Sequence, residues 1–289
     1  MPSKRKPKNY PIHQSPFFML RGKGQFLSVI GVEWESYKQL LAPNLYKVWE
    51  TKKGREIQQP IGWLAVIHKR IGNLLARIEV PDYVFSQKGR SYADNARQHL
   101  GNTALAKTDI NKFYPSTTRS MVFKMFCDDF RCAEDIAHAL ADICCYQQKH
   151  LPTGSPLSGR IAFLASRQMF EDISGVALRE KCVMTAYVDD ITVSGAGATK
   201  KVLGEIRQIV SKYGHKTKKK KSLTYAPYAP KEVTGAIVHG SKLLLPNARH
   251  LKLWLAKAQF SIAVGPDRDK AFREVKGREQ EARQILFPK

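Results

Sequence analysis

The stretch that decides the fold is Cys182-Val183-Met184-Thr185-Ala186-Tyr187-Val188-Asp189-Asp190-Ile191-Thr192-Val193. Its β-branched and aromatic residues predict two strands, and the adjacent aspartates predict the turn that joins them. Burying carboxylates beside a strand is costly unless a cation or hydrogen bonds compensate. A divalent cation supplies that compensation, because hard ions such as Mg²⁺ prefer carboxylate oxygens. Taken alone, an Asp-Asp pair is more typical of an ordinary turn than of a metal site.

A third carboxylate stands in a similar setting upstream. Asp109 follows the short strand predicted at residues 104–108. Carboxylates on two strands from distant parts of the chain can hold two metal ions between them. Such a pair of ions lowers the pKa of an attacking hydroxyl and stabilises in-line phosphoryl transfer.

The composition indicates a nucleic-acid partner. The 289 residues include 48 lysines and arginines against 25 aspartates and glutamates, which gives a formal net charge of +23. Such a field attracts polyanions. With 43% hydrophobic residues the chain can bury a sizeable core, which excludes disorder as its overall state. No apolar run reaches the ~18 residues of a membrane helix, and the polar first residues hold no signal-peptide core. We therefore expect a cytoplasmic protein with no membrane partner.

The order of elements predicts an α+β fold. A Gly54-centred turn indicates a hairpin, and an apolar-periodic helix follows Pro60. Further along, the pattern predicts helices over 119–148, over 157–180 and from Thr199, strands near 222–226 and 233–238, and helices in the last fifty residues. Antiparallel strands separated by long helices favour α+β over a doubly wound parallel sheet.

Three motifs together resemble those of reverse transcriptases. Asp109-Ile110-Asn111-Lys112-Phe113-Tyr114, Leu151-Pro152-Thr153-Gly154-Ser155-Pro156-Leu157-Ser158 and Tyr187-Val188-Asp189-Asp190 match the palm motifs A, B and C of that family, in the proper order. Asn95-Ala96-Arg97-Gln98-His99 and Val233-Thr234-Gly235 are similar to the NAxxH and VTG signatures of bacterial retron reverse transcriptases. The resemblance implies a right-hand fold of fingers, palm and short helical thumb. Residues 1–240 would form the reverse transcriptase domain (fingers and palm), and 241–289 the RNA-binding thumb.

The resemblance also implies a role for individual residues. Asp109, Asp189 and Asp190 would be the catalytic ligands of two Mg²⁺ ions, with the backbone carbonyl of Ile110 as a further ligand. The predicted nucleotide-binding residues are Lys88, Arg90, Tyr114, Gly154, Ser155 and Lys221. Among them, Tyr114 matches the aromatic gate that excludes a ribose 2′-OH, and Arg90 would contact triphosphate oxygens through its fork.

Three features depart from the family pattern. Motif B commonly has Ser-Pro where this chain has Ser158-Gly159. Thr153 stands where motif B often has glutamine, and a hydroxyl cannot make the two-ended contact of an amide. Gly214 followed by Lys221-Ser222 is similar to motif D of the family, in which a lysine lies near the nucleotide. Four consecutive lysines, 218–221, leave the position of that lysine uncertain by one, and Lys221 is our choice.

The RNA-binding candidates carry alternatives. Asn95 and His99 are candidates from the NAxxH signature, although a lone histidine is also typical of a satisfied structural residue. In the thumb the candidates are Arg249, Lys252 and Lys257, on helices that could read the backbone of an RNA stem. A solvated amphipathic helix is the other interpretation, because acidic residues are intermixed.

These features predict an RNA-directed DNA polymerase of retron type, a nucleotidyltransferase that uses dNTPs. The family implies a cognate structured noncoding RNA as template and primer, a branched RNA–DNA product (msDNA), and a separate effector protein in defence against phage. Two alternatives stay open. One is another bacterial reverse transcriptase, of diversity-generating or abortive-infection type. The other is a catalytically silent RNA-binding scaffold.

Overall fold

The computed structural model describes residues 9–52 and 54–287. They form two compact units, each assembled from three segments. Of the described residues, the first unit comprises those within 9–82, 110–172 and 209–216, and the second comprises 83–109, 173–208 and 217–287. The basic residues 1–8 lie outside the described residues. Helices and antiparallel sheets occur together, so the predicted α+β class is confirmed. Within the described residues, no helix is long and apolar enough to cross a membrane.

The first unit is mainly helical and carries one hairpin. Strands β1 (Tyr46–Glu50) and β2 (Glu56–Pro60) pair antiparallel, as predicted. The helix expected after Pro60 is α2 (Gly62–Leu75), which buries an apolar stripe. The other α-helices that lie wholly in the described part of this unit are α1 (Lys23–Ile30), α4 (Phe113–Ser116), α5 (Arg119–Lys124), α6 (Glu134–Cys144) and α7 (Ser158–Ala165).

Two predicted helices are each divided. The single helix expected over 157–180 is α7 followed by α8 (Arg167–Arg179). The break falls at Ser166, whose hydroxyl lies 3.1 Å from Nε2 of His215, a partner distant in sequence. The helix expected over 119–148 likewise consists of α5, a π-helical turn at Met125–Asp129, and α6.

The second unit is built on a four-stranded antiparallel sheet. Its strands, in the order β4-β5-β3-β6, are β4 (Val183–Tyr187), β5 (Asp190–Ser194), β3 (Leu105–Asp109) and β6 (Leu223–Tyr225). Tyr187 pairs with Asp190, so the two-residue turn that joins β4 to β5 is Val188-Asp189. The hairpin is as predicted, but the turn lies one residue earlier than the predicted Asp189-Asp190, and Asp190 is the first residue of β5. Asp109 pairs with Asp190 across β3 and β5.

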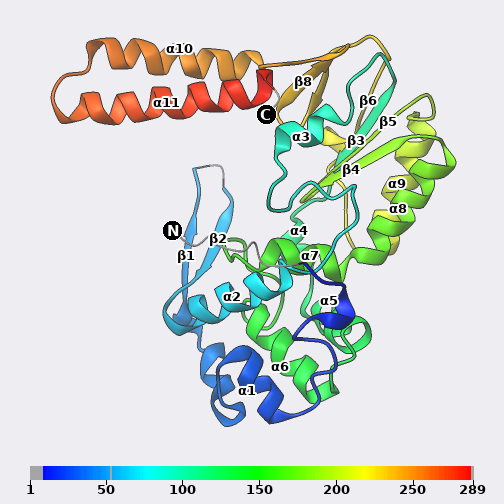
Figure 1. Cartoon of the computed structure of the whole chain (residues 1–289), viewed down its shortest axis with the longest axis vertical. Helices are drawn as coiled ribbons and strands as arrows, with labels where there is room; N and C mark the ends of the chain where they lie inside the picture. Colours follow the sequence, from blue (N-terminus) through cyan, green and yellow to red (C-terminus); the bar gives the residue numbers. More distant parts are fainter. Residues whose placement is uncertain (1–8, 53, 288–289) are drawn as a thin grey trace. The chain divides into compact units, whose positions relative to one another are not determined.

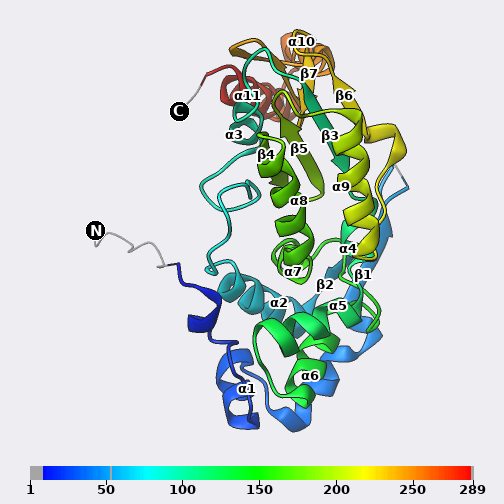
Figure 2. The same cartoon turned by 90° about the vertical axis from the view of Figure 1, so that its right-hand side faces the viewer.

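Each face of this sheet has its own cover. On one face Ala106 of β3 packs against Ala198 and against Leu203 of α9 (Lys200–Lys212). Figure 2 shows α9 beside β3. On the other face Leu105 joins a cluster with Ala96. The elements that supply this second cover are α3 (Tyr92–Arg97), the three-stranded sheet of β7 (Lys231–Val233), β8 (Ala236–His239) and β9 (Lys242–Leu244), and α11. The central strand β3 is therefore fixed on both faces.

The last helices form a pair. α10 (Asn247–Ile262) and α11 (Pro266–Leu286) lie side by side (Figure 1) and are joined by the ring contact of Phe260 with Phe272, 5.7 Å between centroids. Their helical character confirms what the sequence predicted for this segment. The domain boundary at 240/241 stays a prediction.

Candidate active site

The three predicted catalytic aspartates are brought together in the second unit. Strand pairing sets Asp109 opposite Asp190, and Asp189 stands in the adjoining turn. One oxygen of each carboxylate lies within 4.8 Å of the other two. The turn begins with Val188 at φ +58°. A β-branched residue in that region is rare, and a positive φ at the first turn position is what a tight hairpin requires.

The electrostatics of this cluster favour a bound cation. Burial raises the pKa of Asp190 to about 6, and the neighbouring carboxylate of Asp189 adds to the effect. The pKa of Asp189 is raised as well, first by burial and then by Asp109. Each shift means that the ionised form is disfavoured where the carboxylates crowd together. A divalent cation removes that conflict, since carboxylate oxygens are its preferred ligands.

The surroundings of Asp109 test whether the residues of this site suit a divalent cation. The Asp109 oxygen Oδ1 is buried and accepts no hydrogen bond from any described residue. Two ammonium groups lie close: Lys221 Nζ donates to Oδ2 at 2.5 Å, and Lys218 Nζ is 2.5 Å from Oδ1, an ion pair without hydrogen-bond geometry. A buried carboxylate with cations at both oxygens is a cation-binding group, so the residues present fit a divalent ion.

Arg90 and Lys88 lie in the same unit as the aspartates. The segment before them adds to the edge of the sheet, because Phe85 donates its N–H to the carbonyl of Ala186 at 2.9 Å. The Arg90 guanidinium lies over the Phe85 ring, 4.8 Å from its centroid, and lines a pocket of about 270 Å³ together with Arg97. Lys88 is exposed. Their contact with a triphosphate stays a prediction.

Four predicted site residues belong to the first unit: Ile110, Tyr114, Gly154 and Ser155. Gly154 has φ +137°, and a Cβ there would lie 2.9 Å from Cγ2 of Ile57 on β2. The glycine is thus required by the approach of β2. The Ser155 hydroxyl lies 2.7 Å from Nδ1 of buried His68, which shows that this serine also holds the fold of its own unit. The roles of the four at the nucleotide or metal stay predictions.

Gln58 is a residue that the sequence did not single out. Its side-chain carbonyl accepts the N–H of Thr153 at 2.7 Å, and its own N–H donates to the carbonyl of Thr153 at 2.9 Å. An amide side chain therefore stands beside the position where motif B usually carries glutamine. The alternation of β2 places Gln58 inward, but no local signal pairs it with Thr153.

Asn95 and His99 are both 1% exposed. The imidazole of His99 lies 2.7 Å from the hydroxyl of Ser194 on β5 and 2.7 Å from that of Thr185 on β4. Burial lowers the pKa of His99 to about 3, so the ring is neutral. This placement favours the structural interpretation of His99 that the sequence left open.

The two retron signatures meet in this unit. The Asn95 amide donates to the hydroxyl of Thr234 at 3.4 Å, and that hydroxyl donates to the carbonyl of Tyr92 at 2.7 Å. Gly235 has φ +80°, and a Cβ there would lie 2.5 Å from Nη2 of Arg249. The NAxxH and VTG segments therefore support one another and the start of α10.

The three thumb candidates differ in their contacts. Arg249 donates to Glu281 at 2.6 Å and to the hydroxyl of Tyr92 at 3.2 Å. Lys257 forms an ion pair with Glu279 at 3.1 Å. Lys252 is exposed on α10. Lys252 is therefore the candidate best placed for an external phosphate, and RNA binding by all three stays a prediction.

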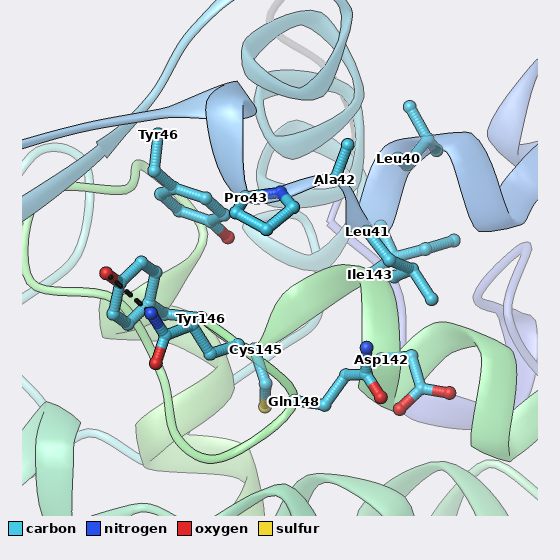
Figure 3. A pocket seen from close by; sticks show the side chains of 11 residues that line it. Leu40, Leu41, Ala42, Pro43, Tyr46, Asp142, Ile143, Cys145, Tyr146 and Gln148 are labelled. Carbon is cyan, nitrogen blue, oxygen red and sulfur yellow. Dashed lines mark hydrogen bonds between the residues drawn. The ribbon is translucent and has the colours of Figure 1, made fainter.

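A separate pocket of about 250 Å³ lies within the first unit, between residues 40–46 and 142–148 (Figure 3). The rings of Tyr46 and Tyr146 meet edge to face, 4.9 Å apart. The Tyr46 hydroxyl is buried, accepts or donates no hydrogen bond among the described residues, and has its pKa raised by burial. None of the predicted site residues lines this pocket.

The sequence matches the family described as reverse transcriptase (RNA-dependent DNA polymerase) over residues 51–253. This match covers more than half of the chain and includes all three aspartates. The chain therefore belongs to the reverse transcriptase family.

Two relatives show which kind of reverse transcriptase the chain is similar to. The chain is 28% identical over 202 residues to the retron Ec86 reverse transcriptase of Escherichia coli. The aligned residues make up 69% of this chain and 61% of that protein. The chain is 29% identical over 164 residues to the retron Se72 reverse transcriptase of Salmonella heidelberg, with 55% and 41% covered. The chain thus spans less than two thirds of the length of either relative. The predicted likeness to bacterial retron reverse transcriptases is confirmed.

A solved structure shares the fold. Telomerase from Candida albicans, in complex with a fragment of telomeric RNA, has a TM-score of 0.51 at 10% identity, covering 84% of this chain and 57% of that one. Identity this low carries information on the fold alone. Together with the family match, it confirms the right-hand polymerase fold.

Proposed function

We propose that this protein is an RNA-directed DNA polymerase of retron type. The observation that carries the proposal is the convergence of Asp109, Asp189 and Asp190, whose carboxylate oxygens lie within 4.8 Å of one another. The buried, mutually repelling carboxylates are suited to divalent ions. Membership of the reverse transcriptase family supports the reaction class.

The chemistry is nucleotidyl transfer. A hydroxyl oxygen of the primer attacks the α-phosphorus of a dNTP, the bond to the bridging oxygen breaks, and pyrophosphate leaves. Two Mg²⁺ ions, when bound by the three aspartates and the carbonyl of Ile110, would lower the pKa of the attacking hydroxyl and offset the triphosphate charge. The chain's own residues orient the reactants: Arg90 and Lys88 hold triphosphate oxygens, and Tyr114 packs against the sugar.

The template is a cognate structured noncoding RNA. Priming from the 2′-OH of an internal guanosine gives a branched RNA–DNA product, which acts with a separate effector protein in defence against phage. The NAxxH and VTG segments and the likeness to the Ec86 and Se72 enzymes support this part of the proposal.

The experiment that tests the retron type is recovery of the nucleic acid that copurifies with the protein. Sequencing is expected to show DNA copied from one defined RNA, and treatment with a debranching enzyme should separate the DNA from that RNA. Heterogeneous or unbranched DNA would favour another bacterial reverse transcriptase. Absence of DNA, together with no dNTP incorporation on any template, would favour the silent RNA-binding scaffold.

A further inference from the structure

Two lysines neutralise Asp109 from within the chain. Lys218 and Lys221 each bring an ammonium nitrogen to 2.5 Å from a different oxygen of this carboxylate. The side chain of Asp109 is 2% exposed, so protein surrounds these oxygens and few directions of approach remain. Both oxygens are thus already in contact with a cation supplied by the protein.

The backbone fixes this arrangement. The N–H of Lys218 donates to the carbonyl of Asp109 at 2.9 Å, and the N–H of Lys221 donates to the carbonyl of Lys218 at 3.0 Å. The hydroxyl of Ser222 lies 2.8 Å from that of Thr108 on β3. The turn 218–222 is therefore attached to β3 at both ends, and Lys218 and Lys221 are its members that face Asp109.

The intervening lysines make a natural comparison. Lys219 and Lys220 belong to the same turn, carry the same charge, and are exposed. Neither is paired with Asp109, since the ion pairs of that carboxylate among the described residues are those with Lys218 and Lys221. The two pairs of lysines differ in contact and not in charge.

We propose that Lys218 and Lys221 are built-in counter-cations that a divalent ion must displace from Asp109, so that this lysine pair sets the metal affinity of the site. The inference rests on the proposed function of the three aspartates. A divalent ion needs carboxylate oxygens at about 2.1 Å and cannot share them closely with an ammonium group of like charge. Displacement is sterically open, because the side chains of Lys218 and Lys221 are 36% and 54% exposed.

A consequence is cooperative binding of metal and nucleotide. An ion that arrives alone leaves two displaced ammonium groups without an anionic partner. When the ion arrives together with a triphosphate, the triphosphate is the anionic partner of the displaced ammonium groups. Metal and dNTP should therefore raise one another's affinity by the same factor, as thermodynamic linkage requires.

The test is a titration of the full-length protein with Mn²⁺, without nucleotide, followed by the electron paramagnetic resonance signal of free Mn²⁺. The Asp190→Asn variant measures the background from ions bound elsewhere. Lys218→Gln and Lys221→Gln are each expected to tighten the site-specific dissociation constant by about tenfold. Lys219→Gln and Lys220→Gln, which remove the same charge from the same turn, should change it less than twofold.

Thermal unfolding with and without Mn²⁺ gives a second measurement, which also applies to variants that are less stable than the wild type. Removing one partner from buried Asp109 should lower Tm in EDTA, and saturating Mn²⁺ should raise Tm more in Lys218→Gln and Lys221→Gln than in the wild type. Equal Mn²⁺ affinity in all four lysine variants, or weaker affinity in Lys218→Gln and Lys221→Gln, overturns the inference.

The two proposals fail in different ways. If the four lysine variants bind Mn²⁺ alike while the wild type incorporates dNTPs, the counter-cation inference is wrong and the polymerase function stands. If Lys218→Gln and Lys221→Gln tighten Mn²⁺ binding but no template supports synthesis, the inference about the lysines stands and the polymerase function fails.

Discussion

Individual buried histidines make the stability of this protein depend on pH. His99 is neutral between two hydroxyl groups in the second unit, with its pKa lowered by burial to about 3. In the first unit, burial lowers the pKa of His68 and of His215 to about 4 each. In the unfolded chain a histidine titrates near 6.5, so the unfolded state binds more protons below that pH. Stability should therefore fall as the pH drops below about 6.5.

A replacement of His99 measures the contribution of this residue to the pH dependence of stability. Between pH 7 and pH 5, protonation of His99 in the unfolded state alone should reduce the free energy of unfolding by about 2 kcal/mol. His99→Gln keeps hydrogen-bonding capacity but cannot titrate. Urea unfolding at the two pH values should show a loss smaller by about that amount in the variant. An equal loss in both proteins would mean that His99 is charged in the folded state.

Gly235 is a residue whose conformation and surroundings both exclude a side chain. It has φ +80°, and a Cβ would meet the Arg249 guanidinium at 2.5 Å. Gly235→Ala should therefore cost about 1–3 kcal/mol and lower Tm by several degrees. Gly175→Ala is the control, because Gly175 lies in α8 with nothing within 4 Å. There alanine should leave Tm unchanged or raise it. A similar Tm for both variants would contradict the account of the VTG segment.

At the scale of elements, two ion pairs among the described residues join α10 to α11, Lys257 with Glu279 and the less exposed pair of Arg249 with Glu281. Arg249 and Glu281 are 2.6 Å apart, with side chains 24% and 39% exposed. A double-mutant cycle with alanine at both positions should give a coupling energy of about 1 kcal/mol in urea unfolding. Arg278 and Glu274, an i,i+4 pair within α11 whose side chains are 31% and 45% exposed, should couple by only about 0.3–0.5 kcal/mol. Coupling no larger between the helices than within α11 would show that this pair does not hold α10 in place.

Local pattern was enough to predict the elements that carry the aspartates. The alternation around Tyr187 and Asp190 predicts a hairpin, and the strand that ends at Asp109 is equally apparent, because each signal lies within a few residues. The break between α7 and α8 was not predictable. It coincides with the contact of Ser166 with His215, two residues remote in sequence, and such a contact leaves no local signal.

Long-range contacts also explain what the sequence left unresolved at the site. Which of the four consecutive lysines face the carboxylate follows from contacts with β3, namely the backbone hydrogen bond from Lys218 to Asp109 and the contact of Ser222 with Thr108. The partnership of Gln58 with Thr153 likewise requires β2 to lie beside the motif B segment. The burial of His99 follows from the pairing of β4 with β5 beneath α3, which the spacing of NAxxH does not reveal.

The charge of the whole molecule predicts how the proposed binding of RNA depends on salt concentration. With a formal net charge of +23, binding should release many counterions, so the logarithm of the association constant should fall linearly with the logarithm of salt concentration. A slope of about −4 to −8 is expected for a protein whose basic residues contact several phosphates, because the slope grows with the number of phosphates contacted. Fluorescence anisotropy of a labelled RNA hairpin at several salt concentrations gives the slope, and a value near zero would contradict phosphate-dominated binding.

Lys252 refines this prediction. It is exposed on α10, whereas Lys257 is already paired with Glu279. If Lys252 contacts a phosphate, Lys252→Gln should make the slope less negative by about one unit, and Lys257→Gln should change it less. Equal effects of the two variants would assign the contribution to overall charge.

The central claim is that Asp109, Asp189 and Asp190 together catalyse DNA synthesis on RNA, and primer extension with purified protein, Mg²⁺ and dNTPs tests it most directly. The wild type should extend a primer on an RNA template. Asp109→Asn, Asp189→Asn and Asp190→Asn should each reduce the rate by about a thousandfold or more while still binding the RNA. Extension at the wild-type rate by any one of the three variants would contradict the account.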